Sequence, residues 1–120
     1  MKKVMIVDDD GDLRSMTELL MKNEGYETLT ATEGNDFLQK VSGFSPDVVI
    51  LDVMMPGLST KEILDQLQKN NQTPKVILFT AVHYSNEEKE NIKKKWNVVD
   101  YISKPFDADA LIEAVHKQLN

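Results

Sequence analysis

Residues 4–10 read Val-Met-Ile-Val-Asp-Asp-Asp, and residues 48–52 read Val-Val-Ile-Leu-Asp. Each stretch is a short apolar run, mostly β-branched, that ends in one or more aspartates. Such runs are typical of strands buried on both faces, as the central strands of a parallel sheet are. Because the carboxyl ends of parallel strands meet at one edge of a sheet, the two motifs predict several carboxylates at that edge.

Outward from these two stretches, the chain alternates between short apolar runs and longer amphipathic segments. The predicted strands are residues 4–7, 27–31, 48–51, 76–79 and 98–102. Apolar residues spaced three or four apart predict helices between and after the strands. Those residues are Leu13, Met16, Leu19 and Leu20, then Ile63, Leu64 and Leu67, and finally Leu111, Ile112, Val115 and Leu119. Residues 34–41 and 86–95 carry weaker helical patterns, and Ser59 or Thr60 is the expected N-cap of the third helix.

Strands that alternate with helices predict an α/β fold with one parallel sheet covered on both faces. The first, third and fourth runs are solidly apolar, whereas the second and fifth contain polar residues (Thr28, Thr30 and Asp100), as edge strands can. With right-handed crossovers, the strand order 2-1-3-4-5 fits best. We therefore expect a flavodoxin-like, doubly wound (βα)5 fold that forms a single domain over residues 1–120.

Composition narrows the classes of function. The 120 residues include 14 Lys and Arg and 20 Asp and Glu, a net charge of −6, and Arg14 is the one arginine. An acidic chain is repelled by nucleic acid and anionic lipid, so neither is an expected partner. The absence of cysteine excludes disulfides and thiolate chemistry. No apolar run approaches the roughly 20 residues of a membrane helix or forms a signal-peptide core, so a cytoplasmic protein is expected.

Polar side chains follow the predicted strands at the expected ligand-binding edge. These are Asp8, Asp9 and Asp10 after the first strand, Asp52 after the third, Thr80 after the fourth and Lys104 after the fifth. Clustered carboxylates repel one another, which favours a bound cation, and oxygen ligands alone favour a hard ion such as Mg²⁺. A lysine and a hydroxyl beside that ion suit a phosphoryl group. A carboxylate can itself attack phosphorus and form an aspartyl phosphate.

Taken singly, these residues have simpler interpretations. Asp9, Asp10 or Asp12 could cap the first helix, and Asp52 or Thr80 could merely end a strand. The dipeptide after the fifth strand, a lysine followed by a proline, could be only a turn. The coincidence of so many such residues at the same end of four strands favours a shared site.

The motifs at these strand ends resemble those of the receiver domains of two-component response regulators. The resemblance covers essentially the whole chain and rests on residues 7–10, 51–57, 79–81 and 101–106. It implies that Asp52 is the phosphoacceptor. The phosphoryl donor would be a sensor histidine kinase or a His phosphotransfer protein.

The resemblance also implies how the site around Asp52 is built. Asp8, Asp9, Asp52 and the backbone carbonyl of Met54 would hold Mg²⁺ or Mn²⁺. Lys104 would pair with the phosphoryl oxygens. The peptide bond between Lys104 and the following proline would be cis, an isomer that X–Pro bonds adopt at modest cost.

Other residues would switch the domain and set the lifetime of the phosphoryl group. Thr80 would turn to hydrogen-bond the phosphoryl group, and Tyr101 would change rotamer to fill the space. The surface of the fourth helix, fifth strand and fifth helix would report the change to an effector that the sequence does not identify. Two positions tune phosphoryl lifetime in similar proteins, and here they hold Met54 and Val82. Neither orients a hydrolytic water well, so we expect a comparatively long-lived phosphoryl group.

Two other classes of function stay open. Residues 8–13 also resemble the first motif of haloacid-dehalogenase-type phosphatases, with Asp8 as nucleophile and Asp10 as acid–base. Against this, Asp12 stands where that family has Thr. A receiver-like interaction module that takes no phosphate is the third possibility, although Asp52 and Lys104 are both retained. We expect a signalling module rather than a turnover enzyme, and a monomer or weak dimer, because the arginine-rich ion pairs of the family's dimerising branch are absent.

Overall fold

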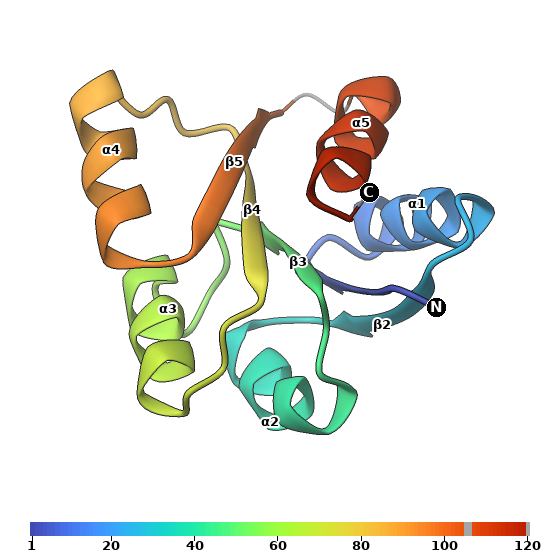
Figure 1. The fold of residues 1–120 in the computed structure, drawn as a ribbon, viewed down its shortest axis with the longest axis horizontal. Helices are drawn as coiled ribbons and strands as arrows, with labels where there is room; N and C mark the ends of the chain where they lie inside the picture. The colour runs from blue at the N-terminus through green and yellow to red at the C-terminus, as the bar shows by residue number, and fades with distance from the viewer. Residues whose placement is uncertain (105–106, 120) are drawn as a thin grey trace.

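The computed structural model describes residues 1–104 and 107–119, and in this part of the chain five strands alternate with five helices (Figure 1). The elements are β1 (Lys3–Val7), α1 (Gly11–Asn23), β2 (Glu27–Ala31), α2 (Gly34–Phe44), β3 (Val48–Asp52), α3 (Thr60–Lys69), β4 (Lys75–Thr80), α4 (Asn86–Lys95), β5 (Val98–Ser103) and α5 (Ala108–Leu119). The strands form one parallel sheet in the order β2-β1-β3-β4-β5. The predicted flavodoxin-like fold and strand order are therefore confirmed.

The register of the strands brings their carboxyl ends level. β1 pairs with β3 so that Val7 lies opposite Leu51, and β3 pairs with β4 so that Asp52 lies opposite Phe79. The residues that follow the central strands consequently emerge together at one edge. β2 and β5 are the outer strands, as their polar residues predicted.

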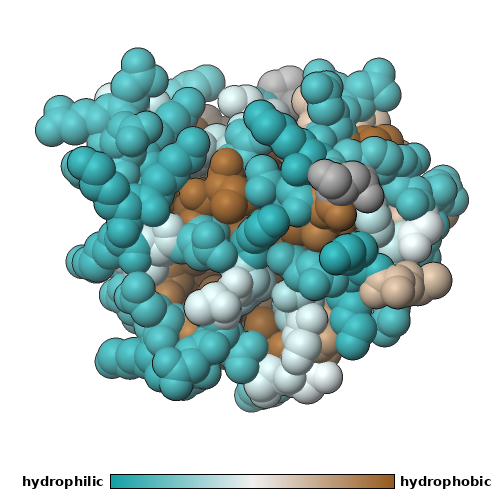
Figure 2. Space-filling view, viewed as in Figure 1, coloured by the Kyte–Doolittle hydropathy of each residue, from teal (hydrophilic) through white to brown (hydrophobic). Residues whose placement is uncertain are grey.

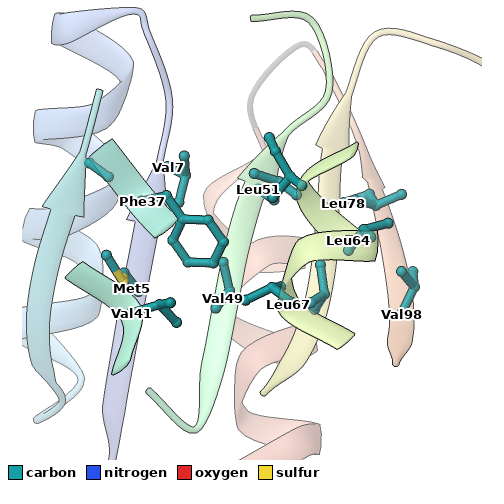
Figure 3. Close-up of a cluster of buried hydrophobic side chains, with 13 residues drawn as sticks. Met5, Val7, Phe37, Val41, Val49, Leu51, Leu64, Leu67, Leu78 and Val98 are labelled. Carbon is teal, nitrogen blue, oxygen red and sulfur yellow. The ribbon is translucent and has the colours of Figure 1, made fainter. Parts of the chain in front are cut away.

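Helices cover both faces of the sheet, and each face has its own apolar core. α1 and α5 lie on one side, and α2, α3 and α4 lie on the other (Figure 1). Figure 3 shows the core on the side of α2, α3 and α4, where Phe37 of α2 and Leu64 of α3 point toward the side chains of β1, β3 and β4. Met5 belongs to this core while Ile6 belongs to the other, because successive side chains of a strand point to opposite faces.

α4 packs lightly on the body of the domain. It has no fully buried side chain, and Ile92 is its one apolar residue. Trp96, which follows the helix, donates from Nε1 to Asp65 Oδ1 of α3 at 2.9 Å. Nearby, Gln68 Nε2 donates to the carbonyl of Lys95 at 3.0 Å. The light packing of this helix agrees with its polar sequence, and the two bonds tie its C-terminal end to α3.

Ser59 is the N-cap of α3. Its hydroxyl accepts a hydrogen bond from the amide of Glu62, whose carboxylate accepts one from the amide of Ser59 in return. Thr60, the other candidate, instead donates its hydroxyl to the carbonyl of Val53 at 3.2 Å. The cap therefore fixes where α3 begins, and Thr60 ties that start to the loop that follows Asp52.

Hydrophilic side chains cover most of the face seen in Figure 2, with hydrophobic ones recessed between them. Met16 and Leu19 of α1 are exceptions on the molecular surface, since each is more than half exposed. Within residues 1–104 and 107–119, no helix combines the length and apolar character needed to cross a bilayer.

Candidate functional site

Asp52 is the last residue of β3, at the point where the strand order reverses. It is only 4% exposed. Its Oδ1 accepts a hydrogen bond from the amide of Met54 at 3.3 Å and lies 3.2 Å from Nζ of Lys104. The carboxylate is thus held in one orientation at the ligand-binding edge of the sheet, with a cation beside one of its oxygens.

Asp8 and Asp9 follow β1 and complete an acidic cluster. Carboxylate oxygens of Asp8, Asp9 and Asp52 all lie within 4.8 Å of one another. Asp9 is exposed, whereas Asp8 is only 2% exposed. The structure therefore brings together the three side chains that the resemblance assigned to a metal site.

The environment of Asp8 disfavours its charge. Burial is the main cause that raises the pKa of Asp8 to about 6. The hydrogen bond that the amide of Asp10 donates to Asp8 Oδ1 at 3.0 Å opposes the rise, and the carboxylate of Asp52 adds to it. Lys104, with Nζ 3.7 Å from Asp8 Oδ2, lowers the pKa of Asp8. A second cation at this cluster would favour the charged form of Asp8.

This donor set fits a divalent cation. Asp8, Asp9 and Asp52 offer carboxylate oxygens alone, which hard cations prefer. Three clustered carboxylates face one lysine, so the cluster retains negative charge that a divalent ion would offset. Two of the three carboxylates are buried, where an unpaired charge is costly.

Lys104 reaches the acidic cluster from β5. Its backbone amide donates to the carbonyl of Thr80 at 2.8 Å, which fixes the chain beside the end of β4. Its ammonium also stands 5.2 Å from the centroid of the Phe79 ring. The ring and the carboxylates together hold Nζ at the mouth of the site. The predicted cis bond after Lys104 involves a residue outside those described and stays a prediction.

Thr80 and Tyr101, the predicted switch residues, both have hydrogen-bond partners in this structure. Thr80 is buried, and its Oγ1 accepts a hydrogen bond from the amide of Val82 at 2.8 Å. The hydroxyl of Tyr101 donates to the carbonyl of Lys89 at 3.3 Å, which links β5 to α4. Burial is the main cause that raises the pKa of Tyr101 to about 12, so its hydroxyl remains a donor at neutral pH.

Met54 and Val82, the two residues expected to tune the lifetime of the phosphoryl group, are placed differently: one borders the site and the other does not. The hollow above the acidic cluster, called here the site hollow, is lined by Asp9, Asp10, Asp52, Met54, Ala81 and Lys104. Met54 is 66% exposed and borders this hollow directly. Val82 follows Ala81 and connects to the site through its hydrogen bond with Thr80.

Two residues shape the loop between β1 and α1. Asp10 is the N-cap of α1, because its side chain accepts hydrogen bonds from the amides of Asp12 and Leu13. Arg14 donates from Nη1 to the carbonyl of Asp8 at 2.8 Å, a contact that sequence reasoning missed. Its signal in the sequence was slight: it is the one arginine, and it follows Asp8 by six residues.

Comparison with known proteins agrees with this geometry. The sequence pattern of the response regulator receiver domain matches residues 4–116. The chain belongs to this family. It is a receiver domain of two-component signalling, with the cluster of Asp8, Asp9 and Asp52 at the phosphorylation site. The phosphatase interpretation is therefore set aside. Receiver domains in general interact with histidine kinases and effectors.

Several solved receiver domains have the same fold. The receiver domain of Francisella response regulator 1452 is 30% identical, with a TM-score of 0.86 over 98% of this chain and 96% of that one. Chemotaxis protein CheY4 of Vibrio cholerae is 28% identical, with a TM-score of 0.86 over 98% of each chain. Response regulator TrrA of Thermotoga maritima, solved in complex with Mg(2+)-BeF, is 36% identical, with a TM-score of 0.80 over 98% of this chain and 99% of that one.

Proposed function

We propose that this receiver domain accepts a phosphoryl group on Asp52 from the phospho-histidine of a sensor kinase or a phosphotransfer protein. The supporting observation is the setting of Asp52, a buried carboxylate 3.2 Å from Lys104 and within 4.8 Å of two further carboxylates. A carboxylate oxygen attacks the phosphorus and forms an O–P bond. The N–P bond to the donor imidazole breaks, and the imidazole nitrogen keeps the electron pair.

Asp8, Asp9 and Asp52 would hold Mg²⁺, with the backbone carbonyl of Met54 as a further ligand. Mn²⁺ would suit the same oxygen ligands. The bound ion supplies neutralisation of the charge on the transferring phosphoryl oxygens. Lys104 pairs with a phosphoryl oxygen, because its ammonium already lies beside the oxygen of Asp52 that faces it.

Thr80 and Tyr101 would convey the change to the surface. Phosphorylation replaces the single charge of the Asp52 carboxylate with a phosphoryl group of roughly two negative charges and adds acceptor oxygens at one point. The hydroxyl of Thr80 would leave the amide of Val82 and donate to a phosphoryl oxygen. Tyr101 would then give up its bond to Lys89, and α4, with no buried side chain, would shift. The surface of α4, β5 and α5 would carry this change to an effector.

The domain would act as a signalling module and not as a turnover enzyme, because each transfer modifies its own Asp52. Its net charge of −6 and single arginine support protein partners over nucleic acid. The lack of an apolar run long enough for a membrane span supports a cytoplasmic location. We expect a monomer or weak dimer.

A phosphoryl mimic tests this proposal without a kinase. We expect beryllofluoride, added with Mg²⁺ to ¹⁵N-labelled protein, to shift the amide signals of Asp52, Thr80 and Val82 in a saturable way. Asp52→Asn should show no saturable shift, and neither should wild type without Mg²⁺. Equal, saturable shifts in Asp52→Asn would contradict the proposal.

A further inference from the structure

We infer that Arg14 is a positioning residue of the phosphorylation site, whose guanidinium holds the backbone of Asp8 so that the Asp8 carboxylate faces Asp9 and Asp52. This inference rests on the proposed function, in which Asp8 is a metal ligand. Arg14 itself lies outside the lining of the site hollow and acts through Asp8.

The backbone of Asp8 needs this support because it lies just past the end of β1. The last paired residue of β1 is Val7, which is in register with Ala31 of β2 and Leu51 of β3. The amide of Asp8 still donates to the carbonyl of Ala31 at 3.2 Å. Its own carbonyl is beyond the strand pairs, and Arg14 Nη1 donates to it at 2.8 Å. A buried carbonyl without a partner would be destabilising.

Arg14 also bonds to the other end of the loop between β1 and α1, through its backbone amide. Its backbone amide donates to the carbonyl of Asp10 at 2.9 Å, as the first turn of α1 requires. The amide of Asp10 in turn donates to Asp8 Oδ1 at 3.0 Å. The side chain and the amide of Arg14 therefore bracket the two ends of the segment from Asp8 to Asp10. With its amide, carbonyl and carboxylate all bonded, Asp8 is held on three sides.

An arginine suits this place for a geometric reason. A Cβ built on Gly11 would lie 3.6 Å from Nη2 of Arg14, so the guanidinium lies along the loop, next to Gly11. A planar, permanently charged donor group makes a short, directed bond to the carbonyl. A lysine would keep the charge but present a compact ammonium on a differently shaped chain.

Charge and geometry predict opposite effects when Arg14 is replaced. A positive charge near the cluster repels a divalent cation, so removing the charge alone should strengthen Mg²⁺ binding. Removing the support of Asp8 should weaken binding instead, because a metal ligand loses its orientation. The sign of the change in affinity therefore separates a positioning residue from a nearby charge.

The test is an NMR titration with Mg²⁺ on wild type, Arg14→Gln, Arg14→Lys and Lys22→Gln. Lys22 is a matched control, because it is an exposed lysine on the same helix and its loss changes the net charge equally. We expect Arg14→Gln to weaken Mg²⁺ binding about tenfold or more, as loss of groups that orient metal ligands does. The Mg²⁺ affinity of Arg14→Lys should lie between those of wild type and Arg14→Gln. The Mg²⁺ affinity of Lys22→Gln should equal that of wild type. In metal-free protein, hydrogen exchange at the amide of Asp10 should speed up in Arg14→Gln and, to a smaller extent, in Arg14→Lys, but not in Lys22→Gln.

Wild-type or tighter Mg²⁺ affinity in Arg14→Gln would overturn the inference. If that variant fails to fold, Arg14→Lys decides, since a wild-type affinity and unchanged exchange at Asp10 would likewise overturn it. Failure of the proposed function would look different, because wild type itself would then bind no Mg²⁺ at the cluster.

Discussion

Asp8 is nearly enclosed by the fold and faces a second carboxylate, and its ionisation is unfavourable for that reason. Burial raises its pKa from 3.8 to about 6. At Asp8, the folded protein therefore holds more of the proton than the unfolded chain does between pH 3.8 and about 6. It follows that the contribution of Asp8 to the free energy of unfolding of the metal-free protein falls as the pH rises through this interval, and that the loss persists above it.

Asp8→Asn should accordingly stabilise the metal-free protein at pH 7.5, by on the order of 1–2 kcal/mol. The neutral amide carries no charge to bury, and its oxygen can still accept the hydrogen bond from the amide of Asp10. Near pH 4 the gain should largely disappear. Urea denaturation in EDTA at both pH values measures this, with Glu113→Gln on α5 as an exposed control. A less stable Asp8→Asn protein at pH 7.5 would show that the buried charge carries no cost.

Met54 borders the site hollow, and its side chain leads to a prediction about the lifetime of the phosphoryl group. Its thioether is a weak acceptor and cannot orient a water for attack on phosphorus. We expect the phosphoryl group of wild type to persist well beyond seconds once the donor is removed, and Met54→Asn to shorten that lifetime. Intact-mass measurements during a chase follow both proteins. Loss of the wild-type adduct within seconds would refute this expectation.

At the scale of elements, the C-terminal end of α4 is tied to α3 by the bond between Trp96 and Asp65. Removing the acceptor of the Trp96 indole with Asp65→Ala should lower the free energy of unfolding by about 1 kcal/mol, the usual worth of such a bond. Hydrogen exchange along α4 should also speed up, because no side chain of the helix is fully buried. Gln66→Ala, at an exposed site on the same helix, is the control. Unchanged exchange in α4 would show that the attachment lies elsewhere.

Some of these elements were predictable from sequence and others were not. The strands and their order follow from apolar runs whose polar residues mark the edges, and residue type predicted Ser59 or Thr60 as the cap of α3, of which the structure has Ser59. The bond between Trp96 and Asp65 joins residues 31 apart and depends on how two helices approach. The bond from Arg14 ends on a backbone carbonyl, which every residue type has, so the sequence does not indicate the partner.

The sheet of the whole molecule explains why the residues of the site could be predicted from the sequence, whereas the hydrogen bonds that they make in this structure could not. Asp8, Asp52, Thr80 and Lys104 come from four strand ends, which a parallel sheet in this order must bring to one edge. Which hydrogen bond Thr80 makes there depends on the loop after it, whose path the residue types leave open. Sheet order thus fixes which residues meet, and local loop geometry fixes what each one contacts.

The most direct test of the central claim is the intact mass of the whole domain after incubation with Mg²⁺ and a small acyl phosphate. Wild type should gain a single phosphoryl group, whereas Asp52→Asn should gain none. Asp8→Asn should label weakly, because a metal ligand is lost while the acceptor remains. A phosphoryl adduct that survives in Asp52→Asn would contradict the assignment of Asp52 as the phosphoacceptor.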